Sequence, residues 1–83
     1  MKILYFSWLR EKVGAGEEDV SLPDGVDTVG ALVTWLRARG ADYDAAFAEA
    51  AQVRVAVNLE HVDLEHPVAD GDEVAFFPPV TGG

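Results

Sequence analysis

The apolar residues of this chain follow two kinds of spacing, and each predicts a different element. Alternation of apolar and polar residues predicts strands over residues 2–9, 17–22, 53–57 and 73–77. Apolar residues spaced i, i+3, i+4 and i+7 from Val29 instead predict one amphipathic helix. Thr28 is its candidate N-cap, and Gly40 is a candidate C′ residue beyond its last turn. The main helix therefore separates two groups of strands.

Two further segments have weaker patterns. Residues 41–51 are rich in alanine and predict a short second helix, with Asp42 or Asp44 as its cap. Residues 59–64 predict a short edge strand or a turn. With a right-handed crossover after the first hairpin, the last strand would lie parallel to the first. The expected fold class is α+β, a mixed sheet packed on one main helix.

Aromatic residues on the first and last strands point to both faces of the sheet, so both faces are expected to be buried against other elements or a partner. Phe76 and Phe77 are adjacent, so on a strand they face opposite ways and only one can fill the core. Phe6 and Trp8 face away from Ile3 in the same manner. Because so short a chain has little left to cover a second face, we expect Phe6, Trp8 and Phe77 to contact a partner protein.

The chain divides into a domain at residues 1–77 and a tail at residues 78–83. Pro78 and Pro79 end the last strand because neither has an N–H group for a ladder hydrogen bond. The remainder, Val80, Thr81, Gly82 and Gly83, has neither a helix signal nor a strand signal, and we expect it to be flexible. Fully extended, the tail reaches about 20 Å. Two terminal glycines would let the terminal carboxylate enter a site too narrow for side chains.

Composition removes several classes of function. The chain has no cysteine, so any sulfur chemistry would have to use the chain terminus rather than a thiol. A net charge of −9 disfavours nucleic-acid binding. No apolar run is long enough to span a bilayer, and we expect a cytoplasmic protein. His61 and His66 lack the spacing of a metal site, so no metal is expected, and no catalytic set of side chains emerges.

The segment from Asp70 to Gly83 closely resembles the C-terminus of the small subunits of molybdopterin synthase. Further likeness lies in the short segments 9–11, 13–14, 56–58 and 66–67, so that the resemblance extends over essentially the whole chain. It implies a ubiquitin-like β-grasp fold for residues 1–77. It also implies contact with the large subunit through Phe6 and Phe77, beside Pro78 and Pro79.

The resemblance further implies a role for the tail. The Gly83 carboxylate would be adenylated by an E1-like activating enzyme that uses ATP, and then converted to a thiocarboxylate by a persulfide donor. Residues 80–83 would insert into the large subunit, where the sulfur passes to cyclic pyranopterin monophosphate in molybdenum cofactor biosynthesis. Two small and two large subunits would form the assembly. The small subunit would bind no cofactor and would be inactive alone.

Three other interpretations remain open at this point. The chain could carry sulfur for thiamine synthesis or for tRNA thiolation, since those carriers share a Gly-Gly end. It could be a ubiquitin-like modifier joined to lysines through Gly83. It could also be a binding module whose tail is incidental.

Overall fold

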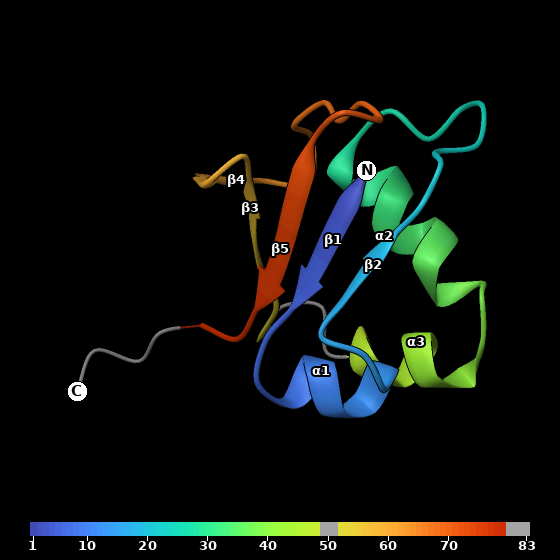
Figure 1. Ribbon diagram of the computed structural model, residues 1–83, viewed down its shortest axis with the longest axis vertical. Coiled ribbons are helices and arrows are strands. Elements are labelled where there is room, and N and C mark those ends of the chain that lie inside the picture. The colour runs from blue at the N-terminus through green and yellow to red at the C-terminus, as the bar shows by residue number, and fades with distance from the viewer. Residues whose placement is uncertain (49–51, 80–83) are drawn as a thin grey trace.

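The protein is built on a five-stranded mixed sheet in the order β2-β1-β5-β3-β4 (Figure 1). The computed structural model describes residues 1–48 and 52–79. The strands are β1 (Lys2–Tyr5), β2 (Glu17–Asp19), β3 (Arg54–Val57), β4 (Glu60–Val62) and β5 (Glu73–Phe77). The neighbouring strands β1 and β5 run parallel, as expected, and the other neighbours pair antiparallel.

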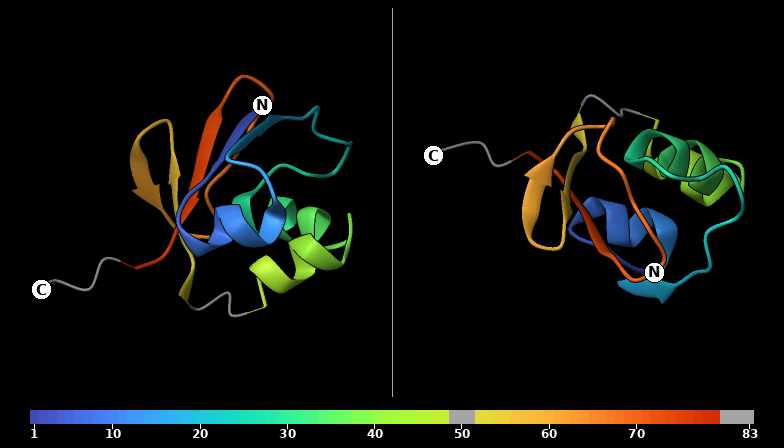
Figure 2. Two further views of the ribbon diagram at one scale, coloured as in Figure 1. Left: turned by 60° about the horizontal axis from the view of Figure 1, so that its bottom comes forward. Right: turned by 90° about the horizontal axis from the view of Figure 1, so that it is seen from above.

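Helices α1 (Trp8–Val13), α2 (Val29–Arg37) and α3 (Ala41–Ala46) lie on the same side of the sheet (Figure 2). The predicted apolar stripe of the main helix is confirmed, since Val29, Leu32 and Leu36 are fully buried. The predicted cap is also confirmed, because the Thr28 hydroxyl accepts a hydrogen bond from the Ala31 N–H at 3.1 Å. Local spacing therefore determined where this helix begins and which side faces the sheet.

The core lies between the helices and one face of the sheet. Alternate residues of the three central strands point into it: Ile3 and Tyr5 from β1, Val74 and Phe76 from β5, and Val55 and Val57 from β3. The ring of Phe76 packs edge-on against Phe47, with centroids 5.0 Å apart. Of the two adjacent phenylalanines, Phe76 is thus the core residue.

The first strand is shorter than predicted. It ends at Tyr5 instead of residue 9, and α1 begins at Trp8 after a turn in which Ser7 has φ 53°. Leu9 is still fully buried, but from a helix rather than a strand. Alternation could not reveal this change, because the turn returns Leu9 to the core side that a continuing strand would also have given it.

Three other predicted boundaries were wrong. The second strand ends at Asp19, since the Leu22 N–H donates to the Asp70 carboxylate at 2.7 Å instead of to a strand. Gly40 is not a left-handed C′ residue; α2 ends at Arg37 with Ala38 as its C-cap, and Gly40 is the N-cap residue of α3. Asp42 and Asp44 consequently lie in the first turn of α3 and do not cap it. The end of β2 depends on a contact with a residue far along the chain. The end of α2 and the start of α3 depend on the very short connection between these helices.

A polar network around Glu18 ties β2 to the helices. One carboxylate oxygen of Glu18 accepts hydrogen bonds from the hydroxyls of Tyr43 at 2.7 Å and Tyr5 at 3.3 Å, and the other pairs with the Arg39 guanidinium. That guanidinium also lies over the Tyr43 ring, 4.8 Å from its centroid. Burial raises the pKa of Glu18, but the hydrogen bonds from Arg39 and Tyr43 outweigh burial and leave this pKa below its ordinary value.

The Glu18→Gln variant is expected to lose about 1–2 kcal/mol of unfolding free energy at neutral pH, because an amide cannot pair with the Arg39 charge. Since the folded-state pKa of Glu18 is depressed, its contribution is present above the unfolded pKa and is lost as the pH falls through the folded pKa. Urea unfolding between about pH 7 and pH 3 should therefore show the difference between wild type and variant shrinking at low pH.

A matched control is Glu17→Gln, which removes the ion pair between Glu17 and Lys2. This pair is exposed, because the Glu17 side chain is 61% exposed and the Lys2 side chain is 48% exposed. This change is expected to cost well under 1 kcal/mol. Equal losses in the two variants, or a Glu18→Gln loss that does not change with pH, would contradict the assigned role of the network.

Candidate functional site: the open sheet face and the root of the tail

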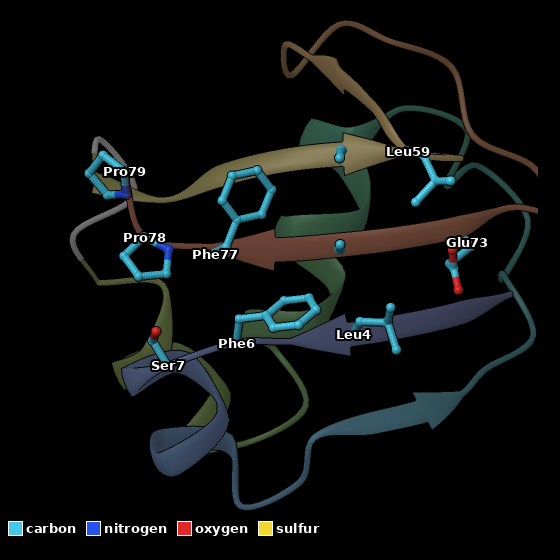
Figure 3. A pocket seen from close by; sticks show the side chains of 10 residues that line it. Leu4, Phe6, Ser7, Leu59, Glu73, Phe77, Pro78 and Pro79 are labelled. Carbon is cyan, nitrogen blue, oxygen red and sulfur yellow. The ribbon is translucent and has the colours of Figure 1, made fainter. Parts of the chain in front are cut away.

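The sheet face opposite the helices carries an apolar surface that the described part of the chain covers only in part, leaving Phe6 and Leu59 exposed (Figure 3). Its position follows from strand alternation, since the residues between core positions must point the other way. We call this surface the open face. It consists of Leu4, Phe6, Ala56, Leu59, Ala75 and Phe77.

Parallel pairing brings the two aromatic residues of the open face together. Tyr5 of β1 is in register with Phe76 of β5, and the Phe6 N–H donates to the Phe76 carbonyl at 3.1 Å. Phe6 and Phe77 therefore lie side by side at the same end of the sheet (Figure 3). Phe6 is 47% exposed, a large fraction for an aromatic side chain outside an interface.

The open face is a shallow hollow that is largely open to solvent. Its volume is about 650 Å³, and Ser7, Glu73, Pro78 and Pro79 complete its lining. Pro78 and Pro79 continue directly from β5 at the end of the hollow where the two phenylalanines lie (Figure 3). The tail thus leaves the domain from the edge of the apolar surface. Val80, Thr81, Gly82 and Gly83, the residues predicted to insert into a partner, lie outside the described residues.

Polar residues border the open face on the β3–β4 side. Arg54 is in register with Phe77, and His61 is in register with Ala56. The His61 ring packs edge-on against Phe77, with centroids 5.3 Å apart. An apolar centre with a polar border is the usual composition of a protein–protein contact.

Sequence reasoning found part of this site and misplaced one residue. The structure places Phe6, Phe77, Pro78 and Pro79 around one hollow, and their contact with a partner stays a prediction. The expectation that Trp8 shares their surface is wrong, because Trp8 lies on α1 and packs against the core cluster, near Lys12 and the end of α3.

Four residues of the open face were missed as site residues: Leu4, Ala56, Leu59 and Ala75. Alternation could have indicated the three strand residues among them, since each neighbours a core position. Leu59 carries no such signal, because it lies in a turn whose direction depends on the hairpin.

The described lining of the hollow carries few polar side chains. The described lining supplies one hydroxyl, on Ser7, and one carboxylate, on Glu73, at opposite ends of the hollow (Figure 3). Across residues 1–48 and 52–79, no group of three or more His, Asp or Glu side chains is placed to hold a metal ion. Over the same residues, no helix combines the length and apolar character needed to cross a bilayer. What the arrangement offers is an apolar docking surface with a tail beginning at its edge.

A mixed sheet wrapped around one main helix, with parallel central strands, defines the ubiquitin-like β-grasp class. Comparison with solved structures confirms this class. The chain matches SAMP1 from Haloferax volcanii, a small archaeal modifier protein, with a TM-score of 0.75 and 30% identity over 100% of this chain and 98% of that one. The chain belongs to the ThiS family, which it matches over residues 3–83.

Relatives with a stated function indicate which kind of ThiS-family protein this chain resembles. The chain is 43% identical to the molybdopterin synthase sulfur carrier subunit of Escherichia coli strain K12, over 100% of this chain and 99% of the relative. It is 37% identical to the protein of the same name from Haemophilus influenzae, again over 100% and 99% of the two chains. The family resemblance and the β-grasp fold expected from the sequence are thus confirmed.

Proposed function

We propose that this protein is the sulfur carrier subunit of a molybdopterin synthase and that it carries sulfur as a thiocarboxylate on Gly83. The observation that supports this most is the open face with the tail beginning at its edge, in a chain that aligns end to end with sulfur carrier subunits. A partner that covers the open face would receive residues 80–83 in its own active site. That partner is the large subunit of the synthase.

The chemistry begins with activation of the terminal carboxylate. A carboxylate is a poor electrophile, so an adenylating enzyme joins it to AMP from ATP and releases pyrophosphate. The terminal sulfur of a persulfide then displaces AMP to form an acyl disulfide. A thiol reduces that disulfide and leaves the thiocarboxylate on Gly83. Because the reaction consumes ATP, we place it in the cytoplasm.

The second stage delivers the sulfur. The thiocarboxylate sulfur is a nucleophile on a short arm, and docking of the domain raises its local concentration at the acceptor, cyclic pyranopterin monophosphate. Acid–base groups come from the large subunit, since Thr81 is the only tail residue with a polar side chain. The carrier is accordingly inactive alone and works within an assembly of two small and two large subunits.

A second candidate is a protein modifier that forms isopeptide bonds to lysines through Gly83. It is favoured by the structural similarity to the small archaeal modifier protein. Both functions begin with an adenylated terminus, so they differ only in the group that then attacks it. Sulfur carriage for another pathway, such as thiamine synthesis or tRNA thiolation, differs only in the final acceptor.

The decisive experiment measures the intact mass of the protein after incubation with ATP, the adenylating enzyme and a persulfide donor from its host. We expect one terminal oxygen to be replaced by sulfur, and we expect the product to convert cyclic pyranopterin monophosphate to molybdopterin once the large subunit is added. Isopeptide adducts in place of the thiocarboxylate would favour the modifier. An unmodified mass would contradict sulfur carriage and would leave the modifier or an incidental tail.

A further inference from the structure

The turn between β3 and β4 contains a residue that its conformation does not favour. Val57 pairs with Glu60, so Asn58 and Leu59 form a two-residue hairpin turn, with φ 50° and φ 70°. Such a turn needs left-handed backbone at both positions, for which Asn followed by Gly is strongly preferred. Asn58 meets this preference. Leu59 does not, because a bulky side chain is disfavoured at positive φ.

Folding does not explain the leucine. The side chain of Leu59 is 89% exposed and takes no part in the core. Burial on folding therefore offsets neither the strained backbone nor the exposed apolar surface. Strain that folding does not require points to a functional use of the residue.

The position of Leu59 indicates that use. It lies over the same hollow as Phe6 and Phe77, but at the opposite end from Pro78 and Pro79 (Figure 3). Its side chain extends the open face beyond the strands.

The turn is also held firmly in place. The Asn58 amide donates to Asp72 at 3.0 Å and accepts from the Glu73 N–H at 3.0 Å. Leu59 is thus presented on a braced turn, which lowers the entropy lost when it binds.

We propose that Leu59 is an anchor for the large subunit, inserted into an apolar recess of that partner at the end of the open face far from the tail. This inference rests on the proposed function and extends it. A tail held at one end would leave the domain free to pivot. A second contact at the other end of β5 sets the orientation in which the terminal sulfur reaches its acceptor. The contact made by Leu59 would be continuous with the rest of the open face. The large subunit must cover that face when it receives the tail.

The test uses Leu59→Asn, because asparagine tolerates left-handed backbone and removes only the apolar group. Binding to the large subunit of the same organism is measured by titration calorimetry. We expect the Kd to rise about tenfold or more, as for loss of a buried anchor, while the thermal midpoint of the carrier stays the same or rises. The matched control is Leu64→Asn. Leu64 is also an exposed leucine, at 57%, but does not line the hollow, and its Kd should stay within about twofold.

The outcomes separate this inference from the proposed function. If the wild type binds the large subunit and Leu59→Asn binds equally well, the anchor is overturned and sulfur carriage stands. If the variant impairs adenylation but not binding to the large subunit, Leu59 serves the activating enzyme, and the anchor is again overturned. If the wild type itself does not bind the large subunit, both fail. A variant that is impaired in binding but less stable than the wild type would attribute the leucine to folding and also overturn the inference.

Discussion

Deletion of Gly83 is expected to abolish molybdopterin formation while the domain remains folded. The new terminus would be the carboxylate of Gly82, drawn back by about 3.5 Å. A displacement of only about 1 Å in a reacting group can cost about a hundredfold in rate, so a shift of one residue should leave no measurable transfer. Among the described residues the core cluster ends at Phe76, well before the deleted residue, so we expect the free energy of unfolding not to change.

The measurement combines molybdopterin synthesis with the purified large subunit and thermal unfolding of the carrier alone. Gly83→Ala provides a matched comparison, because it keeps the length of the tail and adds a single methyl group. If the channel of the partner excludes side chains, this variant should also be strongly impaired. Full activity of the deletion variant would show that the terminus is not the sulfur carrier.

The adjacent phenylalanines are expected to give opposite phenotypes. Phe76→Ala should reduce the free energy of unfolding by about 3–5 kcal/mol, because its ring is 1% exposed and packs against Phe47 and Tyr5. A loss of that size approaches the whole stability of a domain of this length. Phe77→Ala leaves the core intact, so its stability should fall by no more than about 1 kcal/mol, through the lost contact with His61.

Binding should show the reverse order. Phe77 lies on the open face beside Phe6, and we expect Phe77→Ala to weaken binding to the large subunit by about 2 kcal/mol or more. Urea unfolding and calorimetric titration of the same samples measure the two effects. The assignment of faces would be wrong if Phe77→Ala unfolded as readily as Phe76→Ala, or if it bound the large subunit with unchanged affinity.

Local sequence patterns were sufficient for much of the fold. The helical spacing from Val29 and the Thr28 cap located α2, and alternation located β3 and the full length of β5. These elements were predictable because their signals lie within a few residues of one another. The split of Phe76 and Phe77 between two faces followed from the same alternation, and so did the placement of Phe6 and Phe77, two of the six residues of the open face.

Tertiary structure decided the features that depend on residues far apart in the chain. Whether β1 continued past Tyr5 was settled by a turn at Ser7, which moved Trp8 from the open face to the core side. Glu18, with its side chain 16% exposed, became a paired anion only because Arg39, just after α2, and Tyr43, on α3, meet it. Leu59 gained significance only from its backbone angle and its place over the hollow. Periodicity describes neighbours along the chain, whereas strain, charge pairing and surface shape arise from contacts that exist only once the chain is folded.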